Sequence, residues 1–384
     1  MLDGITVLDL ASVGPAARTS RWLADYGAQV VKVGPVPKDG GVQITPPFYA
    51  YSGNRGMQRA QFDLKSDSGK GAFLKLAATA DVVIESFRPG VVARLGIGYE
   101  DVVAVNPSVV YCSTSGYGQT GPASQWAGHD INYLAVGGFL DCSGRDGEGK
   151  PALPGATVAD SAGGGMHAVI AILAALTQRG LSGQGAYLDV SIADGVLGLM
   201  SLYIDEYLAT GTVPGQRHNI LTGRLACYEV YTCGDGKWVS VGAIEPQFYA
   251  NLCRLLGCEQ WIGSQNDDAV QDEIRADFSA AFASKSRDEW VALLAPADTC
   301  VAPIATVPEL VESEQFAARR AIVEATSPTG EAFRQLGWVL AGQDRDQPGP
   351  VVRDATITDT AALLAAAGLS EGDIERLTKE GAIA

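Results

Sequence analysis

The chain has 384 residues, 47% of them apolar, which is enough for a large buried core and more than one domain usually holds. Its 28 basic and 44 acidic side chains give a net charge of −16, which argues against binding to nucleic acid or anionic lipid but leaves room for a local anion pocket. The longest apolar stretch, 166–176, is too short to cross a bilayer, and Asp3 and Asp9 interrupt any export signal. Seven cysteines without paired spacing favour a reduced, cytoplasmic protein.

The first part of the chain alternates predicted strands and helices. Residues 5–10 are predicted as a short buried strand, 14–26 as an amphipathic helix opened by Gly14-Pro15, and 29–33 as a second strand. The alternation continues in a helix and two strands at 73–78, 81–85 and 108–112. Strand-helix-strand units build open, mostly parallel sheets, so we predict an α/β fold.

The later part of the chain has a different pattern of apolar and polar residues. Residues 160–178 are apolar on nearly every side, which predicts a helix buried all round. Segments 228–232 and 238–241 alternate and are joined by a turn-rich stretch, which predicts a hairpin in a second domain. Further helices are expected at 268–284, 286–294, 361–367 and 373–379. We expect a large domain over residues 1–200, a linker over 201–224 and a small domain over 225–329.

A glycine-rich segment, Gly116–Gly121, matches the dinucleotide fingerprint on spacing, with Asp141 twenty residues beyond it. That fingerprint needs its last glycine inside a long helix, whereas Pro122 follows at once. We therefore expect no nicotinamide or flavin site, and predict a loop that lets backbone approach a ligand or another segment closely.

Two polar positions carry the chemistry that we consider. His129, in the pair His129-Asp130, could exchange a proton near neutral pH, or could simply hydrogen-bond to backbone. Asp160 precedes Gly163–Gly165 at the start of the apolar helix, where a carboxylate could cap the helix, transfer a proton or attack a carbonyl. The three glycines imply close approach of a backbone or a ligand.

Other candidates lie elsewhere in the chain. Glu245 follows a predicted strand of the second domain and could be a helix-start carboxylate. Basic residues between Arg55 and Arg94 stand where an open α/β sheet would hold a phosphate-rich ligand. His167 and His218 show no metal-ligand spacing, so we expect no metal.

A series of motifs runs in order along the chain. They are Ile5–Val33, Phe62–Ser66, Glu85–Gly90, Leu95-Gly96, Gly116–Pro122, Gly128–Tyr133, Asp160 with its glycines, Val241–Tyr249 and Gly368–Ile383. Each is weak alone, but the ordered set is specific. Over essentially its whole length the chain resembles the superfamily of family III CoA-transferases and α-methylacyl-CoA racemases, and its racemase branch in particular.

The resemblance implies a Rossmann-like large domain completed by residues 330–384, a smaller α+β domain, and two chains interlocked as a homodimer. The substrate would be an acyl-CoA thioester, with no cofactor beyond its own CoA, no metal, and no nucleic-acid or membrane partner. By position, the residues that would contact CoA are Val13, Phe62, Leu64, Lys65, Phe87, Arg88, Arg94, Gly118 and Tyr133.

The resemblance also gives Asp160 two uses. In the transferases this carboxylate attacks the thioester and carries the acyl group as an anhydride, and in the racemases it moves a proton at the α-carbon. The racemase branch adds a His-Asp pair and a glutamate, matched here by His129, Asp130 and Glu245. We expect an epimerase of (2R)- and (2S)-2-methylacyl-CoA that acts through an enolate, with a CoA-transferase working through Asp160 as the alternative.

The expected epimerisation needs a base on one face of the α-carbon and an acid on the other. We assign neutral His129 as the base, protonated Asp160 as the acid and Glu245 as the group that orients the imidazole. Backbone amides near His129 and Asp130 would meet the enolate oxygen.

Two segments depart from the racemase pattern. Gly34–Lys38 replaces the usual acidic and basic pair after Val33, which implies a rearranged nucleotide contact. Arg224 stands where small residues are common, and either meets a carboxylate at the far end of a dicarboxylic acyl group or faces solvent.

Overall fold

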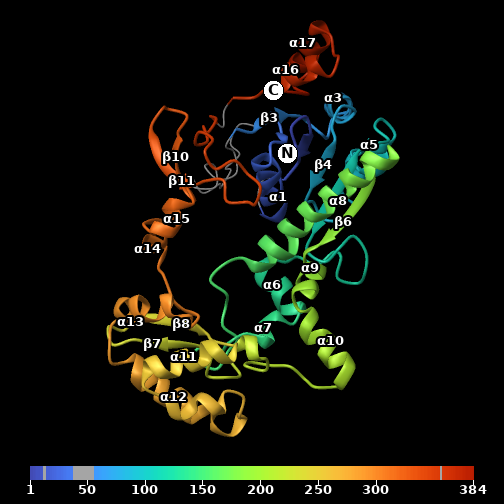
Figure 1. Cartoon of the computed structure of the whole chain (residues 1–384). Coiled ribbons are helices and arrows are strands. Elements are labelled where there is room, and N and C mark those ends of the chain that lie inside the picture. The colour runs from blue at the N-terminus through green and yellow to red at the C-terminus, as the bar shows by residue number, and fades with distance from the viewer. Residues whose placement is uncertain (12–13, 38–55, 355–356) are drawn as a thin grey trace. The chain divides into compact units, whose positions relative to one another are not determined.

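The computed structural model describes residues 1–11, 14–37, 56–354 and 357–384, which form two compact units (Figure 1). Unit 1 comprises Met1–Phe139, Pro154–Asp205 and Glu314–Ala384, and unit 2 comprises Leu140–Leu153 and Glu206–Ser313. The chain therefore enters unit 2 twice, and its last segment returns to unit 1 from residue 314. The sequence places these changes at 225 and 330, and does not indicate the short insertion at 140–153.

Unit 1 is built on a parallel sheet of six strands in the order β3-β2-β1-β4-β5-β6. The strands are β1 Thr6–Asp9, β2 Gln29–Gly34, β3 Gln58–Gln61, β4 Val82–Glu85, β5 Val110–Ser115 and β6 Ala186–Ser191. This Rossmann-like order confirms the predicted α/β class. Strands β1, β2, β4 and β5 are the predicted ones, and their near-continuous apolar character fits a sheet covered on both faces.

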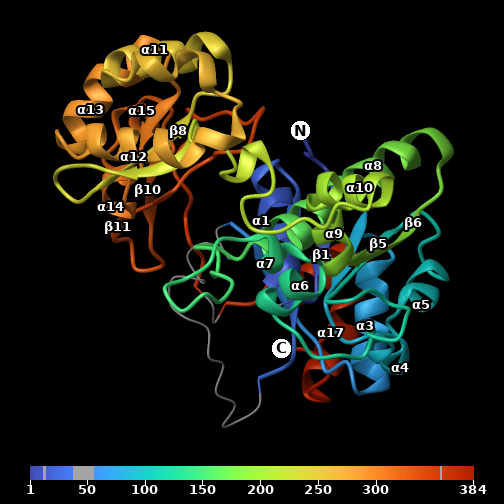
Figure 2. The ribbon, with the colours of Figure 1, turned by 90° about the horizontal axis from the view of Figure 1, so that it is seen from below.

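Helices cover both faces of this sheet (Figure 2). One core, on the side of helix α3 (Asp67–Ala77) and the chain's C-terminal end, holds Leu8, Phe73 and Tyr111. The other core holds Leu23 from α1 (Gly14–Asp25) and Ile172 from α8 (His167–Ser182). The helices of this unit are α1 Gly14–Asp25, α3 Asp67–Ala77, α4 Val91–Leu95, α5 Tyr99–Val103, α6 Asp130–Val136, the π-helix η1 Ala159–Met166, α8 His167–Ser182, α9 Ile192–Leu199, α15 Glu314–Ala318, α16 Thr360–Ala366 and α17 Glu371–Lys379.

The apolar helix after Asp160 is not buried on every side, contrary to the prediction. Helix α8 continues η1, and Ala168 and Ile172 are fully buried, whereas Ile170 and Leu181 are 67% and 84% exposed. Ala159–Ser182 is long and apolar enough to span a membrane by length and composition alone, but a core helix of a soluble protein meets the same criterion. An apolar pattern on every side of a helix predicts that each side is covered, but it does not say by which surface.

Unit 2 contains an antiparallel sheet of three strands, β7 Tyr228–Thr232, β8 Trp238–Gly242 and β9 Val301–Pro303. The β7-β8 hairpin confirms the predicted pattern. The core of this unit contains Tyr249, Phe278 and Trp290, which come from helices of the unit. The helices of unit 2 are α11 Pro246–Leu256, α12 Gln271–Phe282, α13 Arg287–Leu294 and α14 Val307–Val311, with short 3₁₀ turns at Ile220–Thr222, Glu259–Ser264, Asp268–Val270 and Ala295–Ala297.

Some elements have no counterpart in the sequence prediction. Helices α7 Phe139–Cys142 and α10 Ser201–Thr210 lie where the chain passes between the two units. Strands β10 Ile322–Thr326 and β11 Ala332–Leu336 form an antiparallel hairpin within the last segment of unit 1. The unit therefore carries a small second sheet in addition to the parallel one.

Candidate active site

Most of the predicted CoA contacts lie where the parallel strands of unit 1 end. The contacts that follow β3, β4 and β5 are Phe62, Leu64, Lys65, Phe87, Arg88 and Gly118. The strand order reverses between β1 and β4, and in open α/β sheets ligands bind at the carboxyl edge near such a point. The predicted contact Val13, which follows β1, lies outside the described residues.

The basic and apolar members of this set differ in exposure. Lys65, Arg88 and Arg94 are exposed, and none of them pairs with an acidic side chain in the parts of the chain that the structure describes. Phe62 is only 1% exposed and packs edge-to-face on Phe73, so its side chain belongs to the core, and its contact with CoA stays a prediction. Strand ends bring apolar residues to the edge, but sequence does not say which of them turn inward.

Two half-buried side chains of the set stand beside this core. Leu64 and Phe87 pack against it, and the Phe87 N–H donates to Glu85 Oε2 at 2.7 Å. Glu85 itself is 1% exposed at the end of β4. This bond fixes the start of the loop that carries Arg88.

The glycine-rich segment after β5 forms a loop and not the start of a helix. Gly118 and Gly121 have φ of +85° and +88°, which side-chain-bearing residues rarely adopt, and the next helix begins only at Asp130. The Gln119 N–H donates to both carboxylate oxygens of Asp189, at 3.1 and 3.0 Å. The geometry differs from a dinucleotide fingerprint, as the sequence analysis expected.

Tyr133 holds this loop in place. Its hydroxyl donates to the Gly128 carbonyl at 2.6 Å, and its ring occupies the space where a Cβ on Gly116 or Gly128 would lie. Burial raises the pKa of Tyr133 to about 12, and the charge of Asp160 adds to the increase. The residue is 7% exposed, so most of its surface supports the loop and little of it faces a ligand.

The three glycines at the start of the apolar helix allow close helix packing. A Cβ on Gly163 would lie 2.9 Å from the Ile192 carbonyl oxygen, and one on Gly164 would lie 2.7 Å from Pro15 Cβ. A Cβ on Gly165 would lie 2.9 Å from the Trp22 ring. Of the two sequence-level interpretations, close approach of protein is confirmed, and it brings α1 and α9 against η1.

Asp160 is the second residue of η1 and does not cap it. Its carboxylate accepts from Arg18 Nη1 at 3.4 Å, and Arg18 Nη2 donates to Thr157 Oγ1 at 2.8 Å. Burial raises the pKa of Asp160 above its usual value, Arg18 opposes this effect, Asp130 adds to it, and His129 opposes it. π-Helical turns are frequent at functional sites, and this one carries a partly desolvated carboxyl group.

His129 and Asp130 stand at the start of α6, which packs against η1. Asp130 Oδ1 accepts a hydrogen bond from the Asp160 N–H at 2.8 Å, so this carboxylate joins the two elements and does not orient the imidazole. The His129 side chain is exposed, and the backbone N–H of His129 donates to Asn132 Oδ1 at 3.0 Å. That amide is therefore occupied, which leaves the Asp130 amide as the predicted oxyanion donor.

The predicted residues of unit 2 have simpler surroundings. Glu245 is exposed and precedes α11, but its carboxylate caps no amide of that helix. Its contact with His129, a residue of unit 1, stays a prediction. Arg224 forms two hydrogen bonds to Asp268, at 3.1 and 2.5 Å, and both side chains are more than half exposed. The interpretation of Arg224 as a receptor for an acyl carboxylate loses support, because a surface partner already holds the guanidinium.

Arg18 is the site residue that the sequence analysis missed. It lies in the predicted helix 14–26, four residues before Trp22, on the face that meets the glycines of η1. An arginine on the apolar face of a predicted helix is the only sequence signal, and it does not name the partner.

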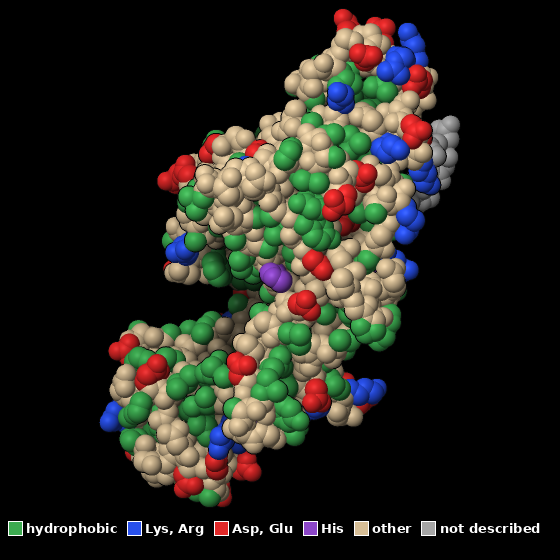
Figure 3. All heavy atoms as spheres, turned by 90° about the vertical axis from the view of Figure 1, so that its right-hand side faces the viewer, with side chains coloured by type: hydrophobic (Ala, Val, Ile, Leu, Met, Phe, Trp, Pro, Cys, Tyr) green, Lys and Arg blue, Asp and Glu red, His purple; other side chains and the backbone are tan. Residues whose placement is uncertain are grey.

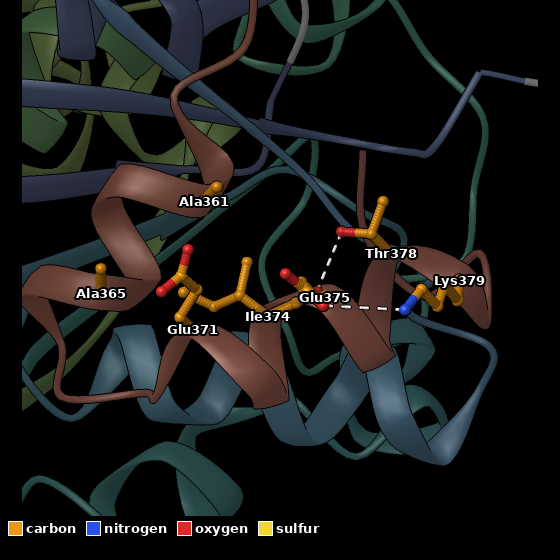
Figure 4. A pocket seen from close by; sticks show the side chains of 7 residues that line it. All are labelled: Ala361, Ala365, Glu371, Ile374, Glu375, Thr378 and Lys379. Atoms are coloured by element: carbon orange, nitrogen blue, oxygen red, sulfur yellow. Dashed lines mark hydrogen bonds and ion pairs between the residues drawn. The ribbon is translucent and has the colours of Figure 1, made fainter.

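Two surface grooves contain no predicted site residue. Figure 4 shows one of about 570 Å³ between α16 and α17, lined by Ala361, Ala365, Glu371, Ile374, Glu375, Thr378 and Lys379. The other, of about 390 Å³, lies in unit 2 beside β7 and β8. Across the described ranges, no three His, Cys, Asp or Glu side chains are arranged to hold a metal ion. All seven cysteines are free.

Comparison with known proteins finds racemases and CoA-transferases among the relatives of this chain. The chain is 37% identical to the α-methylacyl-CoA racemase of Mus musculus over 325 residues, which is 84% of this chain and 82% of that protein. It is 31% identical to the succinyl-CoA:glutarate CoA-transferase of Homo sapiens over 367 residues, 92% of this chain and 80% of that protein. A CaiB/BaiF family protein from Brucella suis superposes with a TM-score of 0.78 at 28% identity, covering 95% of this chain and 99% of that one.

The family match covers nearly the whole chain. Residues 2–353 match CoA-transferase family III, a range that includes the whole parallel sheet, the loop before α6, η1 and unit 2. Racemases and transferases both occur among the relatives, so the match fixes the enzyme family and leaves the reaction open. The chain belongs to CoA-transferase family III.

Proposed function

We propose that this protein is an acyl-CoA epimerase that interconverts (2R)- and (2S)-2-methylacyl-CoA, as the name of its mouse relative describes for that protein. The observation that carries the proposal is the group around Asp160. The partly desolvated carboxyl group of Asp160 lies near the exposed imidazole of His129. The backbone N–H of Asp160 donates a hydrogen bond to the Asp130 carboxylate. Desolvation favours the protonated carboxyl group that the epimerisation requires.

The proposed reaction balances without any other reagent. Neutral His129 removes the α-proton from one epimer, and the thioester becomes an enolate. Protonated Asp160 then delivers a proton to the opposite face, and the two groups exchange roles in the reverse direction. The Asp130 amide would stabilise the enolate oxygen, an effect worth about 3–4 kcal/mol in other enzymes. The CoA of the substrate is the only cofactor in this scheme.

The CoA moiety would lie at the carboxyl edge of the parallel sheet. The exposed cations Lys65, Arg88 and Arg94 supply positive charge for its phosphates in a chain that is acidic overall. Leu64 and Phe87 supply apolar surface beside the same strand ends. Replacing Arg88 and Arg94 by Gln should weaken CoA binding without abolishing the exchange chemistry.

The test is incubation with a (2R)-2-methylacyl-CoA in deuterium oxide. The expected result is deuterium at the α-carbon and formation of both epimers, without any acceptor acid. His129→Ala and Asp160→Asn should each abolish formation of the second epimer and still bind CoA, because the two faces of the α-carbon are then no longer both served. Formation of both epimers by His129→Ala would refute the role of the imidazole.

A CoA-transferase is the second candidate, supported by similarity to the human transferase and by the Arg18 contact. A neighbouring guanidinium favours the ionised carboxylate, which is the nucleophilic form. In that reaction Asp160 attacks the thioester carbon, CoA leaves as the thiolate, and an aspartyl anhydride remains. Hydroxylamine would convert the anhydride into a protein hydroxamate in the wild type and not in Asp160→Asn.

We also propose that two copies form a homodimer through the exposed apolar face of the helices after Asp160. The large exposed side chains on α8 and α9 are Ile170, Leu181, Leu197 and Leu199. Figure 3 views the side of the chain that carries α8 in Figure 1, and shows hydrophobic side chains at that surface. Large exposed apolar patches mark interaction sites in soluble proteins. Light scattering should give twice the chain mass for the wild type and the chain mass for Ile170→Glu.

A further inference from the structure

Arg18 is the one cation in direct contact with the carboxyl group of Asp160 in the described part of the chain. Two bonds fix its direction, because Nη2 donates to Thr157 Oγ1 at 2.8 Å while Nη1 faces Asp160 Oδ2 at 3.4 Å. The stem of Arg18 lies against Gly165, where an added Cβ would meet Arg18 Cβ at 3.4 Å. The glycines of η1 therefore allow α1 to place this guanidinium beside Asp160.

The charged and titratable groups around Asp160 come from two elements, α1 and α6. From α1, Arg18 supplies positive charge, and from the start of α6, Asp130 supplies negative charge and His129 supplies positive charge when it is protonated. Tyr133 also faces Asp160 and is neutral near physiological pH. Burial and Asp130 disfavour the ionised carboxyl group, so Arg18 is the permanent charge that offsets them.

We propose that Arg18 is a positioning residue of the reaction, which, anchored on Thr157, fixes the direction of the Asp160 carboxyl group and balances the negative charge of Asp130. The inference rests on the proposed function only in taking Asp160 as the reacting group. An acid-base residue must exist in both forms during turnover, and partial burial without a balancing cation disfavours the ionised form of the carboxyl group. Arg18 stabilises the ionised carboxylate of Asp160, which is the form needed in the direction of reaction in which Asp160 acts as the base.

The direct test is a titration of Asp160 that does not depend on activity. Protein labelled with ¹³C at the aspartate carboxyl carbons is followed by NMR, and the Asp160 signal is the one absent from Asp160→Asn. In Arg18→Gln the Asp160 titration should move to higher pH than in the wild type. Arg376→Gln, an exposed arginine paired with Glu380 on α17, removes the same charge elsewhere and should leave the signal unchanged.

Kinetics separate the two parts of the proposal. Arg18→Gln should lower kcat for α-proton exchange about tenfold or more and change KM less than about twofold, because it misdirects a reacting group without removing a CoA contact. Thr157→Val keeps the charge and loses the anchor, so it should lower kcat while the NMR titration stays near that of the wild type. Arg18→Lys should retain most of the titration and lose part of kcat.

The outcomes can be told apart. An Asp160 signal that titrates identically in wild type and Arg18→Gln would overturn the proposal, and so would a kcat equal to that of the wild type. If the wild type shows no α-proton exchange, the epimerase function fails, but the titration still decides whether Arg18 controls Asp160. Circular dichroism of each variant checks that it is folded.

Discussion

The crossing of α9 over η1 makes a sharp prediction about two glycines on one helix. A Cβ on Gly195 would lie 1.9 Å from the Gly163 carbonyl oxygen, whereas a Cβ on Gly198 would meet nothing within 4 Å. Alanine favours a helix over glycine by about 1 kcal/mol at an open position. The two substitutions therefore change helix propensity equally and differ only in packing.

Gly195→Ala requires α9 and η1 to separate by at least about 1 Å, because real Cβ contacts are not shorter than 3.0 Å. Overpacking of this kind costs about 1–3 kcal/mol, and more where the obstacle is backbone, which exceeds the gain in propensity. With a cost at or above the upper end of this range and a propensity gain of about 1 kcal/mol, we expect Gly195→Ala to be destabilised by about 2 kcal/mol or more relative to the wild type. Gly198→Ala should be neutral or slightly stabilised.

The assay is urea unfolding of the three proteins followed by circular dichroism, with the midpoint compared at constant slope. The crossing also holds the turn that carries Asp160, so Gly195→Ala should lower kcat for exchange and Gly198→Ala should not. Equal stability of the two variants would show that the helices are not packed as closely as described. It would also remove our explanation for the glycines of η1.

Three further changes test other parts of the structure. Burial raises the pKa of Glu85 from 4.5 to about 7, so the folded state binds more protons than the unfolded state in this range. The wild type should lose stability relative to Glu85→Gln as pH rises from about 4.5 to about 7. A difference in unfolding free energy between the two proteins that does not change with pH would contradict this. Tyr133→Phe removes the bond to the Gly128 carbonyl and should cost about 1 kcal/mol, with faster hydrogen exchange in the loop before α6, and unchanged protection would refute the assigned role. Arg224→Gln should cost less than about 1 kcal/mol, because the pair with Asp268 is exposed. It should not change selectivity between simple and dicarboxylic acyl-CoA, and a specific loss of the dicarboxylic substrate would restore a role in recognition.

Local patterns in the sequence were sufficient for the elements that depend on nearest neighbours. The run from β1 through α1 to β2 follows from a buried strand, an amphipathic period and a second strand, and each signal lies within one element. The β7-β8 hairpin follows from its turn residues. Strand β3, with the sequence Gln-Arg-Ala-Gln, was not predicted because its polar side chains carry no strand signal. It forms by hydrogen bonding of its backbone to β2.

The motifs also selected His129, Asp130 and Asp160 as a candidate group, but not their contacts. That the Asp130 carboxylate holds the Asp160 amide, and that Arg18 meets a residue 142 positions away, depends on how α1 and α6 pack on η1. A carboxylate before three glycines is equally consistent with a helix cap. Only the packed neighbours show that this one is partly buried and paired.

The sequence by itself determined the alternation of strands and helices, the acidic balance of the chain and the order of its motifs, because these are properties of adjacent residues. The tertiary structure decided that Phe62 is buried in the core, that Ile170 faces outward and that Arg18 lies beside Asp160. The physical reason is that periodicity reports which side chains avoid water, whereas the partner of each side chain is set by contacts between segments far apart in the chain.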